Sequence, residues 1–131
     1  MTQAARVPYR VSAGSRRRYV TARYVAGCLA VVDVSRLRPG ACGRFEVLHA
    51  PSGLRVSGDG FGALRPARWF AVHAACACPE LRLMRGPADA DGLSLRDRSR
   101  LLDRLGSARE AALLTDGRGV QTGRSEKRGR L

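Results

Sequence analysis

The chain has 131 residues, of which 44% are hydrophobic, so it is long enough to bury a core and too apolar to be disordered throughout. Its 24 basic residues face only 11 acidic ones, which gives a formal net charge of +13. The longest apolar run, Val25 to Val32, is too short to cross a bilayer, so no membrane partner is expected.

The excess positive charge lies mainly at the two ends of the chain. Residues 1–24 carry six arginines and no acid, and residues 118–131 carry five basic residues against one acid. Residues 25–117 carry 13 arginines and 10 acids. We therefore expect a basic flexible N-terminal arm over 1–18, a single α+β domain over 19–117 and a basic flexible tail over 118–131.

The N-terminal region matches an export signal only in part. Ser15 to Val20 contains the arginine pair of a twin-arginine signal, and Val25 to Cys28 has the form of a lipoprotein cleavage site. However, Arg23 interrupts the segment that should be apolar, and too few apolar residues precede Cys28. We expect a cytoplasmic protein whose four cysteines are reduced.

The first half of the chain is predicted to form strands. Residues 19–34 are rich in valine, tyrosine and alanine, which indicates one long strand or two short ones broken near Gly27. Apolar and polar residues then alternate on both sides of Ala50–Gly53. Because proline presets φ in a turn and glycine accepts a left-handed conformation, residues 44–57 predict a β-hairpin.

A first helix is predicted over about 66–77, because Pro66 suits a first helical turn and alanine is frequent in the residues that follow. The apolar stripe expected to face the core consists of Trp69, Val72, His73 and Cys76. A strand over 69–78 is the alternative, and residues 80–84 could add a short strand.

A second helix is predicted over about 95–114, where Ser94 is a suitable N-cap with Asp97 three positions later. The face expected to be buried consists of Leu101, Leu105, Ala108 and Ala112. Gly106 leaves open a helix–break–helix or one bent helix. Together these elements predict an α+β fold, with a small, mostly antiparallel sheet of three or more strands and both helices packed on one face.

The arginine-rich ends predict contact with a nucleic acid. Arginine pairs with phosphate in a fork, clustered cations gain from counterion release, and the tyrosines among the first arginines could stack on unpaired bases. We expect a small non-enzymatic accessory protein that binds DNA or RNA mainly through phosphate contacts. The residues expected to make these contacts are Arg10, Arg16, Arg17, Arg18, Arg23, Arg124, Lys127, Arg128 and Arg130.

The alternative function is a protein-interaction or assembly module, whose basic tails act on an acidic protein partner or serve solubility. Its mark would be an exposed apolar patch on a sheet face that no helix covers. The sequence contains no Ser/His/Asp or Cys/His arrangement that stands out, so neither an enzymatic activity nor a cofactor is expected.

A zinc site is a weaker possibility. The ligands it would draw on are Cys28, Cys42, His49, His73, Cys76 and Cys78. Structural zinc sites usually show paired ligands two to four residues apart, whereas this chain offers one Cys-x-Cys pair. Packing in the core is the favoured role for these side chains.

Two groups of residues resemble anion sites. Gly58, Gly60 and Gly62 precede Arg65 and Arg68 near a helix start, but the P-loop ending is missing, so this segment is expected to be a connector. The second group is a stripe of Arg96, Arg100 and Arg104. Neighbouring aspartates neutralise much of this stripe, and an ordinary solvent-facing helix surface is expected there.

Overall fold

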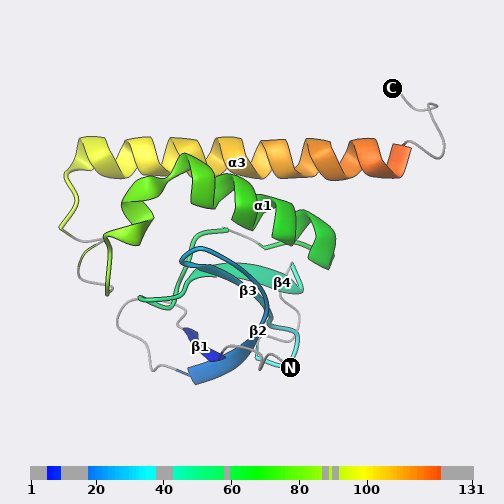
Figure 1. Ribbon diagram of the computed structural model, residues 1–131, viewed down its shortest axis with the longest axis horizontal. Coiled ribbons are helices and arrows are strands. Elements are labelled where there is room, and N and C mark those ends of the chain that lie inside the picture. Colours follow the sequence, from blue (N-terminus) through cyan, green and yellow to red (C-terminus); the bar gives the residue numbers. More distant parts are fainter. Residues whose placement is uncertain are drawn as a thin grey trace.

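The computed structural model describes residues 6–9, 18–37, 43–57, 60–86, 89 and 92–121. Five antiparallel strands form a meander in which each strand pairs with the next along the chain. They are β1 (Arg6–Tyr9), β2 (Arg18–Ala26), β3 (Leu29–Asp33), β4 (Phe45–His49) and β5 (Leu54–Arg55). Two α-helices lie on one side of this sheet, which confirms the predicted α+β class (Figure 1).

Two of the turns between consecutive strands contain a glycine with positive φ. The hairpin predicted over 44–57 is confirmed as β4 and β5, and Gly53 in its turn has a φ of 76°. Residues 19–34 form two strands rather than one, with Ala26 paired to Leu29 across a turn in which Gly27 has a φ of 60°. Glycine accepts this conformation because it has no Cβ atom.

The strand β1 corrects one prediction. A flexible arm is expected over 1–18, but Arg6–Tyr9 pairs with β2 in antiparallel register, and both Val7 and Tyr9 are buried. This four-residue strand is too short for a periodic pattern to show in the sequence. Residues 10–17, which connect Tyr9 to its partner Arg18, lie outside the described residues.

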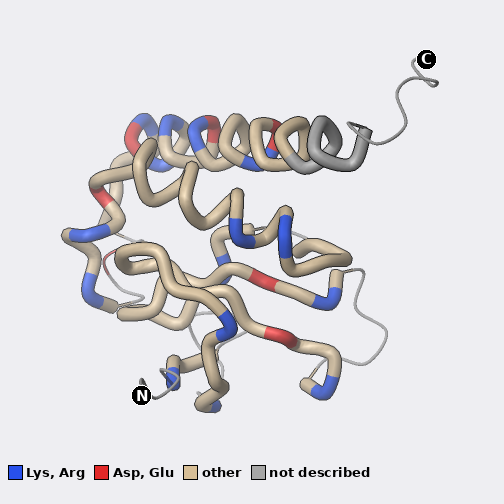
Figure 2. The backbone as a smooth tube through the Cα atoms, turned by 45° about the vertical axis from the view of Figure 1, so that its right-hand side comes forward, with Lys and Arg blue, Asp and Glu red and all other residues tan. Residues whose placement is uncertain are grey.

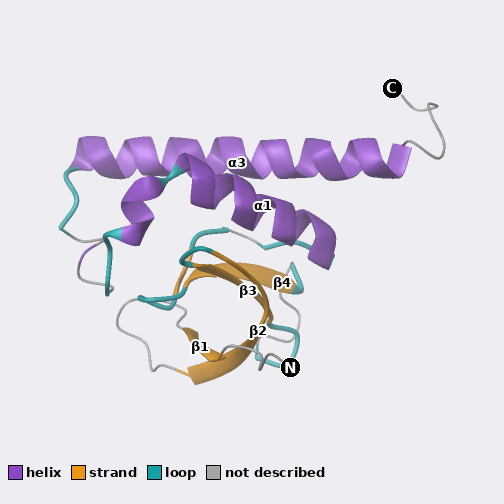
Figure 3. Ribbon diagram, in the orientation of Figure 1, coloured by secondary structure: helices purple, strands orange, loops and turns teal. Residues whose placement is uncertain are grey.

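The sheet curls, so that both faces of its central strands are buried (Figure 3). Val31 and Val47 face the helices, whereas Val32 and Leu48 point into the curl and meet Val7 of β1. A Cβ atom at Gly53 would lie 3.1 Å from the carbonyl oxygen of Pro8, so the turn after β4 passes close to β1. The curl therefore gives the molecule a second small core inside the sheet.

The helix α1 (Leu64–Ala77) lies between the sheet and the last helix (Figure 1). It confirms the helix predicted near 66–77, and the strand alternative over 69–78 is wrong. Its buried residues are Pro66, Ala67, Phe70, Ala71 and Ala74. The predicted core stripe is also wrong, because Trp69 and Cys76 are exposed. Alanine lets α1 approach its neighbours closely, whereas an indole requires far more space.

The short 3₁₀ helix η1 (Pro79–Arg82) follows α1, so the possible strand over 80–84 does not form. Proline suits a first helical position because it has no N–H to leave unpaired there. Leu81 in this turn is buried, and its carbonyl oxygen lies 2.6 Å from Nε2 of His49. This contact fixes η1 to the end of β4.

The helix α3 (Leu95–Gln121) is continuous through Gly106, so of the two alternatives that the sequence left open, the helix–break–helix is wrong. The Ser94 hydroxyl accepts a hydrogen bond from the Asp97 amide at 3.1 Å, as the capping sequence predicts. The buried face is the predicted one, formed by Leu101, Leu105, Ala108 and Ala112. The helix extends beyond the predicted domain boundary at residue 117, and no helix in the described ranges is long and apolar enough to cross a membrane.

Candidate nucleic-acid interface

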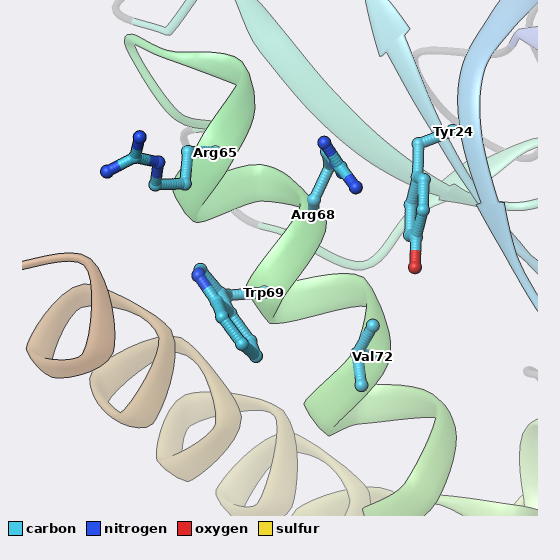
Figure 4. Close-up of a pocket in the computed structure, with 5 residues that line it drawn as sticks. All are labelled: Tyr24, Arg65, Arg68, Trp69 and Val72. Atoms are coloured by element: carbon cyan, nitrogen blue, oxygen red, sulfur yellow. The ribbon is translucent and has the colours of Figure 1, made fainter. Parts of the chain in front are cut away.

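A cleft of about 290 Å³ lies between β2 and the outer face of α1. It is lined by Tyr24, Arg65, Arg68, Trp69 and Val72 (Figure 4). All but Tyr24 come from α1, at the i, i+3, i+4 and i+7 positions that share one face of a helix. The alanine-rich face opposite is buried, and this orientation holds the two arginines and the tryptophan outward.

The guanidinium group of Arg68 joins the two walls of the cleft. Its central carbon lies 4.7 Å from the centre of the Tyr24 ring, within the range of a cation–π contact. The side chains of Arg65 and Trp69 extend together from the other side of α1, while Arg68 turns towards Tyr24 (Figure 4). The cleft thus combines two cations with two aromatic rings.

Trp69 presents a large aromatic surface to solvent. The residue is 40% exposed, and its ring stacks on His73 with the centroids 6.0 Å apart and the planes 29° from parallel. Within the described part of the chain, the Nε2 atom of His73 is buried without a hydrogen-bond partner. The helical spacing of Trp69, Val72, His73 and Cys76 wrongly predicts that Trp69 faces the core. Ala67, Phe70, Ala71 and Ala74 also recur at helical spacing, and this second pattern could have identified the buried face.

The electrostatic character of the two helices differs. α1 contains two arginines and no acidic residue, whereas basic and acidic residues are mixed along the first half of α3 (Figure 2). In the predicted stripe on α3, Arg104 forms an ion pair with Glu80 at 2.6 Å. The arginines of α1 therefore have no acidic neighbours within their own helix, whereas those of α3 do.

The glycine-rich segment before α1 is held by an arginine of α3. Arg109 donates hydrogen bonds to the carbonyl oxygens of Ser57 and Gly60, both at 2.9 Å, and lies 4.4 Å from the centre of the Phe61 ring. Gly60 has a φ of 83°. These contacts give the segment a structural role in joining the hairpin to α3.

Most of the residues predicted to contact nucleic acid lie outside the described ranges. They are Arg10, Arg16, Arg17, Arg124, Lys127, Arg128 and Arg130. Arg18 begins β2 and is exposed, at the end of the sheet where it pairs with Tyr9. Residues 10–17, which contain three of the predicted arginines, connect Tyr9 to Arg18. Because these two residues pair in the sheet, both ends of the connection are fixed.

Arg23 is engaged by a carboxylate. Its Nη1 atom lies 3.6 Å from Oδ2 of Asp33, which Arg44 also contacts at 2.8 Å. The hydrogen bond from Arg44 is the largest cause that lowers the pKa of Asp33 to about 2. Asp33 is therefore ionised at neutral pH and compensates part of the charge that Arg23 offers.

The residues considered for zinc are dispersed in the described structure. Cys76 is exposed and Cys78 is buried, and no three potential ligands come together within the described ranges. Both ring nitrogens of His49 have partners, with Nδ1 2.8 Å from the Ser52 hydroxyl and Nε2 near Leu81. Burial lowers the pKa of His49, so its neutral form is favoured. Cys42 lies outside the described residues.

Comparisons with protein-family models, with curated proteins and with solved structures find no match to this chain.

Proposed function

We propose that this protein is a non-enzymatic accessory protein that binds DNA or RNA, mainly through phosphate contacts of its arginine-rich ends. The observation that carries the proposal is that carboxylates of the folded body form ion pairs with arginines of the body itself. Three of its carboxylates, Asp33, Glu46 and Glu80, already form ion pairs with arginines of the body. Most of the excess positive charge of the sequence lies on residues 1–24 and 118–131, where Arg23 also pairs with Asp33, and we expect the other cations of these ends to contact an external polyanion.

Phosphate contacts carry little sequence information. The expected binding is consequently weakly dependent on sequence and strongly dependent on salt, because each neutralised phosphate releases counterions. The cleft on α1 supports the proposal from the body side, since it adds two arginines and two aromatic rings without a carboxylate among its lining residues.

The experiment compares full-length variants by fluorescence anisotropy with a labelled oligonucleotide. One variant carries Arg10→Gln, Arg16→Gln and Arg17→Gln; a matched control removes three exposed body charges by Arg82→Gln, Arg96→Gln and Arg100→Gln. Another variant replaces the four basic residues at 124, 127, 128 and 130 by glutamine. We expect both end variants to bind more weakly than the control. Equal affinities of the end variants and the control would contradict the role of the ends, and no binding by the unaltered protein at low salt would reject the function.

The protein-interaction alternative is supported by a different feature of the structure. Its expected mark, an uncovered apolar face of the sheet, is not found at β3 and β4, whose valines and leucines are buried on both faces. Instead, exposed leucines lie on α3, including Leu95, which is 83% exposed, and Leu102, which is 61% exposed. A stoichiometric protein partner that survives nuclease treatment and no longer binds a Leu102→Glu variant would favour this second function.

A further inference from the structure

We infer that the cleft between β2 and α1 binds one unpaired base and its adjoining phosphates, so that the protein prefers single-stranded over double-stranded nucleic acid. This inference rests on the proposed function and specifies its substrate. The cleft is formed by Tyr24, Arg65, Arg68, Trp69 and Val72.

The stacking surface is the indole of Trp69. Tryptophan is highly buried on average in folded proteins, yet this one is 40% exposed while small alanines fill the interior face of the same helix. The Trp69 ring stacks on the neighbouring His73 ring, and the part of the indole that is exposed to solvent can stack on a planar ligand. Stacking on such a ring does not depend on which base is bound, because every base has an aromatic face.

The phosphate contacts come from the arginines on either side of this ring. Arg65 lies one helical turn before Trp69, and Arg68 lies between the indole and Tyr24 of β2 (Figure 4). A guanidinium group matches a phosphate with two parallel donors. α1 itself contains no acidic residue, so its own charge is purely positive.

The cost of unstacking a base selects against a duplex. The cleft is small, since its volume of about 290 Å³ lies just below the roughly 300–1,000 Å³ usual for small-molecule sites. A base in a duplex is covered on both faces by its neighbours, and unstacking it costs a few kcal/mol. An unpaired base reaches Trp69 without this cost, which gives the preference for single strands.

Trp69 is the only tryptophan in the chain, so its fluorescence reports directly on this site. We expect a short oligothymidylate to quench the emission of the full-length protein, and a duplex of the same length to leave it nearly unchanged. Binding detected by anisotropy for both ligands, with equal affinity and no quenching, would overturn the inference and leave the proposed function intact. Failure of both ligands to bind would overturn the two together.

Substitution gives the second test. Trp69→Ala is expected to weaken oligothymidylate binding by about 5- to 150-fold, with duplex binding little changed, and Trp69→Phe to retain most of the affinity. Leu83→Ala is the matched control, because Leu83 is 79% exposed outside the cleft and its removal should leave both affinities unchanged. Equal reductions of single-strand and duplex affinity in Trp69→Ala would overturn the inference.

The arginines are tested in the same way. Arg65→Gln with Arg68→Gln should reduce oligothymidylate binding more than Arg96→Gln with Arg100→Gln, which removes the same charge from α3. Equal reductions in the two double variants would mean that net charge alone matters, and would overturn the assignment of the phosphate contacts to the cleft.

Discussion

The phenolic hydroxyl of Tyr9 donates a hydrogen bond to Oε1 of Glu46, with 3.1 Å between the two oxygens. Glu46 is fully buried, and Arg55 contacts its other carboxylate oxygen at 3.4 Å. The bond connects β1, at one edge of the sheet, to β4, and the Arg55 contact extends this link to β5 at the opposite edge. It therefore closes the curl with a polar contact inside a mostly apolar core.

Removing the Tyr9 hydroxyl tests how strongly this contact holds the curl. Tyr9→Phe should lower the free energy of unfolding by about 1–3 kcal/mol, because a buried carboxylate loses a donor. Urea denaturation followed by circular dichroism measures the change. Tyr24→Phe is the control, since the ring contact with Arg68 remains, and its effect should stay within about 0.5 kcal/mol. Equal effects of the two changes would contradict the structural role of the Tyr9–Glu46 bond.

The buried imidazole of His49 predicts a loss of stability in weak acid. Burial is the largest cause that lowers its pKa from 6.5, so the folded protein holds it neutral while the unfolded chain protonates it. The free energy of unfolding should therefore be highest above about pH 6.5 and fall as the pH decreases towards the folded-state pKa. In a His49→Gln variant this part of the pH dependence should disappear. An unchanged dependence would show that another group is responsible.

The pairing of Asp33 with two arginines predicts opposite effects on stability and binding. Asp33→Asn should cost up to about 1 kcal/mol of stability near neutral pH. Because the pKa of Asp33 is lowered from 3.8 to about 2, the unaltered protein should lose this contribution as the pH falls through that interval. The variant also releases Arg23 and Arg44, so its affinity for an oligonucleotide at low salt should rise more than that of Asp103→Asn, which changes the net charge equally. Equal increases in affinity would contradict this role of Asp33.

Replacing Gly53 and Gly106 by alanine should change the stability of the fold in opposite directions. Gly53 has a φ of 76°, and an added Cβ atom would lie 3.1 Å from the Pro8 carbonyl oxygen, so Gly53→Ala should destabilise the fold by more than about 1 kcal/mol. Gly106 lies within α3, and apart from its chain neighbours and the backbone of its own helix no described atom lies within 4 Å of the added Cβ, so Gly106→Ala should stabilise the fold by up to about 1 kcal/mol. Thermal denaturation measures both. Destabilisation by Gly106→Ala would argue against a continuous helix.

The parts of the fold that sequence predicts are those specified by local signals. The hairpin over 44–57 follows from alternation around a Pro–Ser–Gly turn, and the start of α3 follows from the Ser94 cap. The strand β1 could not be predicted in this way. Its four residues are held by pairing with β2 and by the bond from Tyr9 to Glu46, 37 positions further along the chain, and both contacts depend on the tertiary fold.

The cleft could be predicted only in part. Arg65 and Arg68 stand out in the sequence near a helix start, but Trp69 and Val72 indicate a core-facing stripe by helical spacing alone. Ala67, Ala71 and Ala74 on the opposite face of the helix are buried instead, because α1 packs against both the sheet and α3. Tyr24 joins the site through the position of β2 against α1, which depends on the tertiary fold.

The salt dependence of binding tests the central proposal most directly. The slope of log affinity against log salt concentration is measured for the unaltered protein and for a full-length variant with glutamine at positions 10, 16, 17, 124, 127, 128 and 130. The unaltered protein should give a steep negative slope. The variant should give a slope shallower by up to about 6 on duplex DNA, or about 0.9 for each phosphate that the substituted side chains no longer neutralise. Equal slopes and affinities for the two proteins would contradict binding through the arginine-rich ends.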